Sequence, residues 1–219
     1  MKLANSLRIL AIIVFCTTMQ ACSKSDSKEN NNSNSAQNTT QTEAECLSKP
    51  NRICNQGLSF AQLGDSLASI KTEGAVIAAK DTLFSTEEMQ WKGKILQLSK
   101  GQVLIEGTQV HTSDGEIDDA NGGNVRAIRI ETPLFETIEG VKVGSTFSEL
   151  KKLHADSLFE VQPAAYSGLL QLRLPSISRI NYFVKESAAL PPAPGDEANM
   201  NSAKNISPEA KIEMISVEE

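Results

Sequence analysis

The stretch Trp91-Lys92-Gly93-Lys94-Ile95-Leu96-Gln97-Leu98 is followed by Ser99-Lys100-Gly101 and then by Gln102-Val103-Leu104-Ile105-Glu106. Two β-type runs joined by a three-residue loop that contains glycine are typical of a β-hairpin. Further β-type runs follow along the chain, at 125–130, 169–174 and 180–184. The alternation at 125–130 predicts a half-buried strand. We therefore predict an α+β fold in which antiparallel strands form one or more sheets and short helices connect them.

A helix start lies between these strands. Gly144 precedes Thr146-Phe147-Ser148-Glu149, in which a hydroxyl residue and a glutamate three positions later form a capping-box pattern. Gly144 is expected to bend the backbone at positive φ, Thr146 to accept a helical N–H, and Phe147 to enter the core. Apolar residues continue at helical spacing, which predicts a short amphipathic helix that ends near His154. The motif needs no ligand, so we interpret it as structural.

Two pairs of segments suggest an internal duplication. Gly64–Lys71 aligns with Gly144–Lys151 at an offset of 80 residues, and Ile95–Leu98 aligns with Leu169–Leu172 at an offset of 74. Each unit would consist of a turn led by glycine, a capped helix and a pair of strands. Capped helices and alternating strands also resemble one another by chance, and of the two interpretations we favour the duplication.

The end of the chain is predicted to leave the globular body and return to it. Residues 188–206 are rich in proline and polar side chains and are expected to form a loop. In 207–219, the apolar residues Ile212, Met214 and Val217 predict one last strand at an edge of the sheet. A frayed helix over the same residues is the alternative.

Cys46 and Cys54 stand at the start of the body, with seven residues between them. Two cysteines that carry no lipid most often pair in an oxidising compartment, and a loop this short contributes about 2–3 kcal/mol in the chain-entropy model. Zinc is a weaker alternative, because neither His111 nor His154 lies nearby in the sequence and no second cysteine pair follows. A redox-active pair usually has C-x-x-C spacing. We therefore predict a structural disulfide.

The first residues have the features of a targeting segment. The basic stretch Met1–Arg8 precedes an apolar run over 9–19, which is too short to cross a bilayer as a helix but is typical of a secretory signal. The run ends in Met19-Gln20-Ala21-Cys22, which resembles the processing site of a bacterial lipoprotein signal. The resemblance implies a signal peptide over 1–21, and a diacylglyceryl group and an N-linked acyl chain such as palmitate on Cys22. An ordinary secreted protein cleaved nearby is the alternative.

The residues after Cys22 predict how the protein is held. Three acyl chains exceed the two signals that stable membrane anchoring needs. Ser23 implies, by analogy with enterobacterial sorting, release to the outer membrane. No large apolar or aromatic residue occurs in Ser23–Glu45, so we expect residues 22–45 to form a lipidated cysteine and a disordered tether.

The charge of the chain excludes one class of partner. The formal net charge is −6, and the signal peptide removes two of the positive residues, Lys2 and Arg8, and no negative one. An acidic chain is repelled by a phosphate backbone, and an aromatic content of 5% leaves few side chains on which bases could stack. We therefore expect no nucleic-acid partner.

The second half of the body carries a family resemblance. The residues are Ile128-Arg129-Ile130, Thr137, and Gly140 to Leu150, and the closing pattern Lys211–Ile215 agrees loosely. This segment of about 30 residues resembles gammaproteobacterial envelope lipoproteins that are regulated by the envelope-stress factor sigma-E and carry a domain of unknown function. More distantly, the Gly-x-Thr-x-x-Glu-Leu pattern resembles a helix start in small lipoproteins of the outer-membrane assembly machinery. Neither resemblance implies a catalytic residue.

A search for reactive groups finds no convincing site. His111 is interpreted as an exposed loop residue, and Asp114–Asn124 as a solvated loop, since it lacks the register of a calcium-binding EF-hand. Trp91 is interpreted as a core residue, with a contact to a partner as the alternative. An enzyme would require distant carboxylates such as Glu106 and Asp119 to converge in a cleft. We predict no catalytic residue, no metal site and no cofactor.

These observations combine into one expectation. The globular α+β domain covers 46–187, and the protein is a lipid-anchored envelope protein at the outer membrane that faces the periplasm. Its function is expected to be non-enzymatic interaction with another envelope protein, and its membrane contact is the anchor on Cys22. The alternative is a periplasmic domain that binds a small ligand or acts as an inhibitor.

Overall fold

The computed structural model describes residues 43–70, 72, 74, 76–85, 90–108, 123–155, 158–164, 168–174, 178–191 and 202–219. The predicted signal peptide, Cys22, the tether up to residue 42, and the loop residues 109–122 lie outside these ranges. In the described part of the chain, no helix has the length and apolar character needed to span a membrane.

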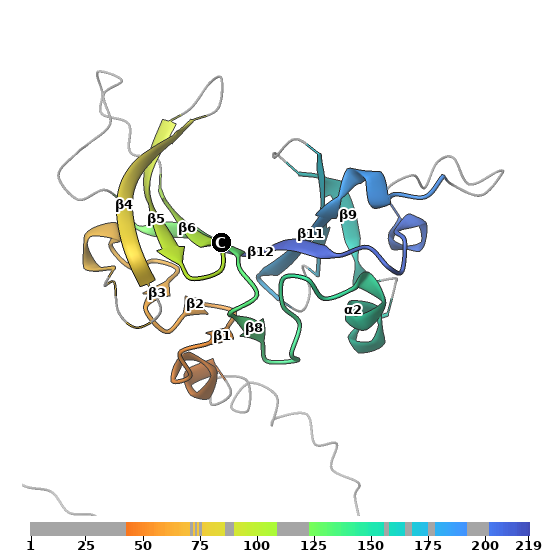
Figure 1. Cartoon of the computed structure of the whole chain (residues 1–219), viewed down its shortest axis with the longest axis horizontal. Coiled ribbons are helices and arrows are strands. Elements are labelled where there is room, and N and C mark those ends of the chain that lie inside the picture. Colours follow the sequence, from red (N-terminus) through yellow and green to blue (C-terminus); the bar gives the residue numbers. More distant parts are fainter. Residues whose placement is uncertain are drawn as a thin grey trace, which may run out of the picture. The chain divides into compact units, whose positions relative to one another are not determined.

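Short strands and single helical turns make up most of the fold, and Figure 1 labels many of them. The strands are β1 (Arg52–Ile53), β2 (Gly57–Leu58), β3 (Ala61–Gln62), β4 (Val76–Ser85), β5 (Gln90–Leu98), β6 (Gln102–Gly107), β7 (Val125–Glu131), β8 (Glu136–Thr137), β9 (Glu160–Pro163), β10 (Leu169–Arg173), β11 (Ile180–Lys185) and β12 (Ile212–Glu218). The helices include a helical segment at 43–47, α2 (Phe147–Leu153) and the 3-10 turns η1 (Leu67–Ser69), η3 (Glu186–Ala188) and η5 (Ala203–Asn205).

An eight-stranded antiparallel sheet dominates the structure, in the order β4-β5-β6-β7-β12-β11-β10-β9. The predicted hairpin is present as β5 and β6, and Gly101 in its loop has φ 89°. The fold is α+β, as the sequence predicts, with a sheet and few short helices.

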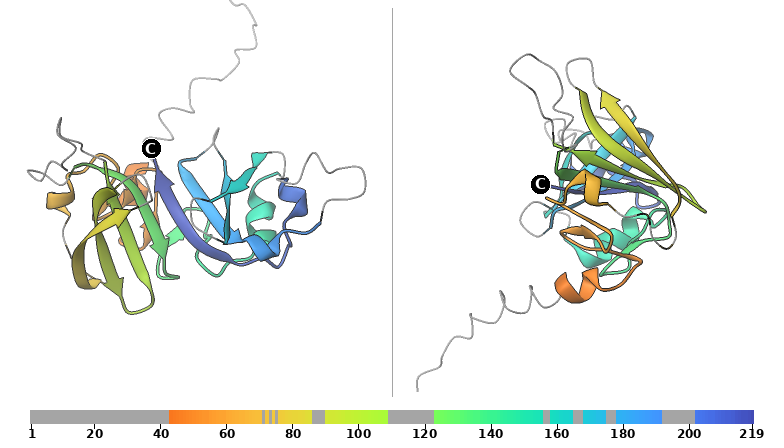
Figure 2. Two further views of the ribbon diagram at one scale, coloured as in Figure 1. Left: turned by 90° about the horizontal axis from the view of Figure 1, so that it is seen from above. Right: turned by 90° about the vertical axis from the view of Figure 1, so that its left-hand side faces the viewer.

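The last strand corrects the sequence analysis. The apolar pattern around Ile212 and Val217 predicts a strand at an edge, but β12 lies at the centre of the sheet, between β7 and β11. Figure 2 shows β12, in dark blue, beside β7, in green. Ile215 pairs with Ile130 on one side and with Tyr182 on the other, and it is completely buried. The folded domain therefore extends to residue 218, and a boundary at 187 omits its central strand.

The core lies on one face of the sheet. Buried aliphatic side chains of β5, β6, β7 and β12 form a single cluster with residues of the segments that precede and follow these strands. They include Leu58 of β2, Leu67 of η1, and Phe147 and Leu150 of α2. The chain segments β1 to η1 and α2 therefore cover the apolar face, which explains why strands as short as two residues persist there.

The opposite face of the sheet is polar near its centre. The sequence predicts a half-buried strand at 125–130, but Ala127 and Arg129 on the second side of β7 are also buried. Arg129 pairs across the strands with Ser216, and it forms an ion pair with Glu106. The strand is buried on both sides because it is central and because its polar side chains find partners there.

The two halves of the sheet have matching topology. β4 to β7 form one four-stranded meander and β9 to β12 form another, and the last strands of the two meanders pair with each other. The turns also match: the backbone N–H of Gly64 donates to the carbonyl of Val125 at 2.8 Å, and that of Gly144 to Ile212 at 2.8 Å. Gly64 and Gly144 have φ 86° and 92°. These pairs of features are compatible with the duplication that we favour from sequence.

The bulges correct the alignment of the two halves. The strand register shifts at Glu106/Gly107 in the first half and at Phe183/Val184 in the second. Glu106 pairs with Gly93 of β5, and Phe183 pairs with Gln171 of β10. If the two bulges are matched, Glu106 corresponds to Phe183, and their partners Gly93 of β5 and Gln171 of β10 correspond to each other. The sequence alignment also matches β5 with β10, but it does so at an offset of 74 residues, whereas the bulges give an offset of 78.

The first helix of the repeat also differs from the expectation. The sequence alignment predicts a capped helix after Gly64, but η1 is one 3-10 turn, and the side chain of its N-cap residue Ser66 makes no capping hydrogen bond. The position equivalent to Glu149 holds Ser69, whose hydroxyl donates to the Ser66 carbonyl instead. A capping box requires a carboxylate or amide at this position, so the first half has no equivalent of α2.

Candidate functional site

The edge of the sheet at β4 is a long and largely exposed strand. β4 has ten residues, Val76–Ser85, and none of them is fully buried. Ile77 is 68% exposed and Leu83 56% exposed, the two largest values among the exposed large hydrophobic residues of the described chain. Long, apolar edge strands promote pairing with other chains, so most proteins protect them. This edge is therefore the first candidate for a functional surface.

An aromatic contact holds one end of β4 on the sheet. Phe84 pairs with Trp91 of β5, and their rings stack with centroids 6.1 Å apart and an interplanar angle of 25°. The next residue on this face of β5 is Gly93, where a Cβ atom would overlap the ring of Phe84 and the backbone of Ile105. An aromatic ring that covers a glycine on the neighbouring strand stabilises a sheet edge. Trp91 is thus buried as predicted, and it supports the edge.

A buried cluster of charges lies beside this aromatic contact. The carboxylate of Glu106, on β6, is fully buried and forms ion pairs with Arg126 and Arg129 of β7. Arg126 is the extra residue of the bulge opposite Glu106 and Gly107, and its Nη2 lies 3.2 Å from Oε2 of Glu106. Its guanidinium also lies 5.0 Å from the centroid of the Trp91 ring. A bulge redirects a side chain, and here it brings a second arginine to the buried carboxylate.

Burial shifts the pKa values of Glu106 and Arg129. It raises the pKa of Glu106 to about 7, while the Arg126 charge and the hydrogen bonds from Trp91 and Arg126 act in the opposite direction and the Glu218 charge adds to the rise. Burial also lowers the pKa of Arg129 to about 10, so this arginine stays protonated at neutral pH. Removing Glu106 would take away the buried carboxylate with which the Arg129 charge is paired, which is destabilising.

We expect Glu106 to make the stability of the domain depend on pH. Because its pKa is higher in the folded than in the unfolded state, the folded state binds more protons between pH 4.5 and about 7. The free energy of unfolding should therefore fall as the pH rises through this window, by at most about 3 kcal/mol. Urea unfolding of the wild type and of Glu106→Gln at pH 5 and pH 7.5 measures the difference. An equally steep fall in the variant would show that another group is responsible.

The helix-start motif positions the central strand. Thr146 Oγ1 accepts a hydrogen bond from the Glu149 backbone N–H at 3.2 Å, and Glu149 Oε2 accepts one from the Thr146 N–H at 2.7 Å. This capping box begins α2, as predicted from the sequence. The backbone N–H of Phe147 donates to the carbonyl of Ala210, just before β12, and its ring is fully buried. The motif therefore fixes the place where the chain enters β12.

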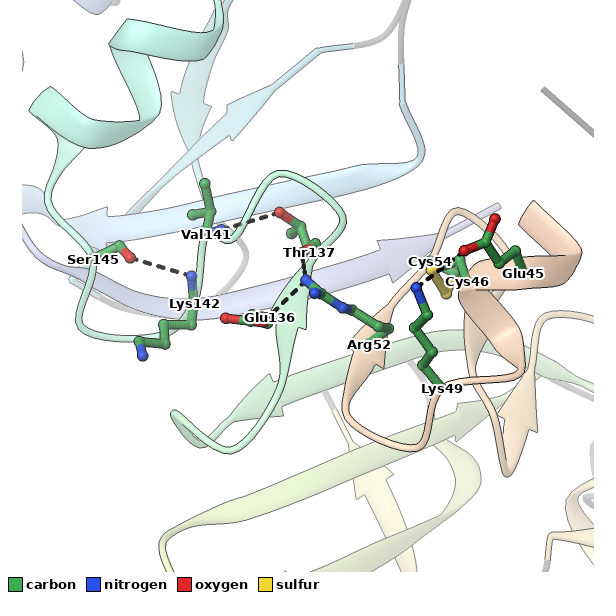
Figure 3. A network of polar contacts seen from close by, with 10 residues as sticks. All are labelled: Glu45, Cys46, Lys49, Arg52, Cys54, Glu136, Thr137, Val141, Lys142 and Ser145. Atoms are coloured by element: carbon green, nitrogen blue, oxygen red, sulfur yellow. Dashed lines mark hydrogen bonds and ion pairs between the residues drawn. A yellow bond between two sulfur atoms is a disulfide. The ribbon is translucent and has the colours of Figure 1, made fainter. Parts of the chain in front are cut away.

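A second polar network joins the start of the domain to the linker between its halves (Figure 3). Cys46 and Cys54 form a disulfide with Cα atoms 6.0 Å apart. Two residues before Cys54, Arg52 extends to β8, where its Nη1 lies 3.0 Å from Glu136 Oε1 and donates to the Thr137 carbonyl at 2.8 Å. β1 and β8 pair in parallel at the same point. These contacts have a structural role, because they fix the start of the domain to β8.

A hollow with both apolar and polar lining residues lies at the opposite end of β4 from Phe84. It has a volume of about 930 Å³, and residues of several segments line it: Pro50, Asn51, Ser59, Phe60, Ser69, Gly74, Val76, Leu98, Ser99, Leu134 and Phe135. The rings of Phe60 and Phe135 lie 6.1 Å apart at one side of it. A hollow of this size and lining can accept a small apolar molecule.

The remaining predicted residues fall into two groups. His154 ends α2 and packs edge-on against Phe159, at 6.0 Å between ring centroids. His111, Asp119 and most of Asp114–Asn124 lie outside the described residues, so the structure does not place Asp119 relative to Glu106. Within the described ranges, no group of three or more histidine, cysteine, aspartate or glutamate residues is arranged to hold a metal ion.

Sequence reasoning missed the β4 edge. The segment Val76–Ser85 has apolar residues at both ends, which is a signal for a strand, but Lys80 and Asp81 interrupt the pattern. Asp81 is paired with Lys94 of β5 in the structure. The pairing of Glu106 with two arginines was also not expected, because it depends on a bulge that no local pattern reveals.

Comparisons with known proteins give a structural likeness but no sequence match. The sequence matches no protein-family model and no curated protein. Among solved structures, the crystal structure of the uncharacterized protein yfeY from Escherichia coli is similar, with a TM-score of 0.48 and 16% sequence identity. The likeness covers 77% of this chain and 99% of that one.

Proposed function

We propose that this chain is a lipid-anchored protein of the bacterial envelope, held at the outer membrane by acyl chains on Cys22, and that it acts by binding another protein through the β4 edge. It works on the periplasmic side and without catalysis, in the assembly of the envelope or its response to stress. Two features support this function: the targeting sequence that ends at Cys22 and the exposed edge strand β4.

The observation that carries the interaction function is the exposure of β4. Ile77 and Leu83 are apolar, largely exposed, and placed on a ten-residue strand whose outer side has no partner among the described strands. A strand edge of this kind recognises an extended segment by backbone hydrogen bonds and by pockets for alternate side chains. It therefore suits protein recognition better than chemistry on a small substrate.

The sequence before the domain supports the location. Ala21-Cys22 ends an apolar run of signal length, and the polar stretch from Ser23 onward leads directly into the described domain at residue 43. The resemblance of Gly140 to Leu150 to sigma-E-regulated envelope lipoproteins agrees with the same location. A tether of this length lets the domain reach a partner near the membrane while the anchor holds it there.

The buried charges support a structural role for the best-placed carboxylate. Glu106 is enclosed by two guanidinium groups, and all three side chains belong to neighbouring central strands. A carboxylate held in this way connects two neighbouring central strands beside Trp91, which favours a structural role.

Site-specific cross-linking in intact cells tests the proposed function. The photoreactive residue p-benzoylphenylalanine is placed at Leu83, on the β4 edge, and in a second strain at Glu160, an exposed residue of β9 at the other edge of the sheet. Irradiation should give cross-linked products from position 83 that are absent or much weaker from position 160. No product from position 83 above the level at position 160 would contradict the function.

Binding of a small apolar ligand is the second candidate, and the hollow beside Phe60 and Phe135 favours it. Saturable binding of an apolar fluorescent probe, lost in Phe60→Ser, together with no cross-linking from β4, would favour this function over protein binding.

A further inference from the structure

We propose that the β4 edge binds an extended protein segment that carries a large apolar side chain, and that this side chain enters the hollow beside Phe60 and Phe135. The inference rests on the proposed function, and it names the chemistry of the partner that the edge takes. The segment would add a strand to β4 by backbone hydrogen bonds, and the hollow would hold the side chain that gives the contact its specificity.

The hollow and the free edge meet at the first residue of β4. Val76 begins this strand and also lines the hollow, and its partner on β5, Leu98, lines the hollow as well. Among the described strands, only β5 pairs with β4, so the outer side of β4 offers backbone donors and acceptors to an incoming strand. Side chains directly opposite each other on neighbouring strands lie on the same face of a sheet. The residue of an incoming strand that lies opposite Val76 would therefore be on the side of the hollow.

A bulge separates the hollow from the regular part of the edge. The register of β4 shifts between Val76 and Ala78, whereas the pairing with β5 is continuous from Ala78 to Ser85. Ile77 is the extra residue of the bulge. Bulges bend a strand and interrupt its pairing. We therefore expect the partner segment to pair with residues 78–85 and to reach the hollow with the residue at one of its ends.

The lining of the hollow determines which side chain fits. Phe60, Val76 and Leu134 are only partly buried, and they pack against the apolar core of the domain, so the core is incompletely covered at this point. The described residues that line the hollow include no charged side chain. A large aromatic or aliphatic side chain would bury apolar surface here, whereas a charged side chain would lose its hydration without gaining an ion pair.

A second apolar contact gives the spacing of the partner's residues. Leu83 is 56% exposed and pairs with Lys92, while Val76 pairs with Leu98. The two partners on β5 are six positions apart, and residues an even number of positions apart in a strand lie on one face. An incoming strand with the same spacing as β5 would therefore place one side chain over Leu83 and another, six positions away, in the hollow. We expect both of these partner residues to be apolar.

Filling the hollow tests the inference. Ser99 lines the hollow and is an exposed residue of the loop between β5 and β6, so Ser99→Trp would occupy the hollow with the chain's own side chain. The full-length protein carries p-benzoylphenylalanine at Leu83 and is irradiated in intact cells, with and without Ser99→Trp. The variant should reduce the cross-linked products about tenfold or more, because the partner can no longer bury its apolar side chain.

Cross-linking from the hollow itself gives an independent measurement. Ser59 is another exposed residue that lines the hollow, and p-benzoylphenylalanine at this position should give a product of the same mass as the product from Leu83. Products of unrelated masses from the two positions would contradict a single segment that occupies both the edge and the hollow.

A matched control and the alternative outcomes separate the two proposals. Ser187→Trp changes an exposed serine on η3 and should leave the products from Leu83 unchanged, and both tryptophan variants should unfold at the same urea concentration as the wild type. Products from Leu83 that persist at the wild-type level in Ser99→Trp would overturn the inference and leave the proposed function standing. If Ser99→Trp also abolished binding of the apolar probe N-phenyl-1-naphthylamine, that outcome would assign the hollow to a small apolar molecule instead. No product from Leu83 above the level at Glu160 would overturn both proposals.

Discussion

Ile215→Asp is expected to abolish folding of the domain. Ile215 is completely buried on β12, between Ile130 of β7 and Tyr182 of β11. The change removes the burial of a branched side chain and places a carboxylate among apolar groups with no compensating partner. We expect a loss of about 5 kcal/mol or more, which is comparable with the total stability of a typical domain. Near-ultraviolet circular dichroism and urea unfolding of the purified protein measure the effect.

Ile77→Asp is the matched control, because it makes the same substitution on another strand of the same sheet. Ile77 is 68% exposed at the β4 edge, so a carboxylate there stays in water and should change the free energy of unfolding by less than about 0.5 kcal/mol. A folded Ile215→Asp protein, with stability close to that of Ile77→Asp, would contradict the central position of β12.

Cys22→Ala is expected to abolish membrane attachment. Because the acyl chains would be the only apolar anchor in the proposed arrangement, their loss should move the protein from the membrane fraction to the soluble periplasmic fraction. Incorporation of labelled palmitate in growing cells, followed by fractionation, measures both effects.

Cys16→Ala provides the control for this result. Cys16 lies inside the apolar run, after the bulky Phe15, and is expected to be removed with the signal peptide. Labelling and membrane attachment should therefore be unchanged in Cys16→Ala. Palmitate incorporation that persists in Cys22→Ala would overturn the anchor and, with it, the proposed location.

Local patterns were enough to predict several elements of this fold. The β5–β6 hairpin depends on two alternating runs and Gly101, and α2 depends on Thr146 and Glu149, all of which act over a few residues. The disulfide in the structure joins the two cysteines that compartment and spacing favour, Cys46 and Cys54. These features are recognisable because each one is stabilised by neighbours in the sequence.

The order of the strands was not predictable in the same way. The pattern of Ile212, Met214 and Val217 indicates a strand but does not reveal which strands it joins, and its pairing with β7 brings together Ile130 and Ile215, which are 85 positions apart in the sequence. The ion pairs of Glu106 depend on the pairing of β6 with β7, since a bulge at Arg126 creates the second of them. Sequence reasoning therefore found most of the strands and placed the central one at the edge.

The central claim is that β12 is a central strand of the sheet and that β4 is an edge strand. Hydrogen exchange of the full-length, lipidated protein tests this claim most directly. We predict the slowest amide exchange in β7 and β12, and faster exchange in Val76–Ser85, where the backbone groups on the outer side of β4 have no partner among the described strands. Exchange in β12 as fast as in β4 would contradict the central position of β12.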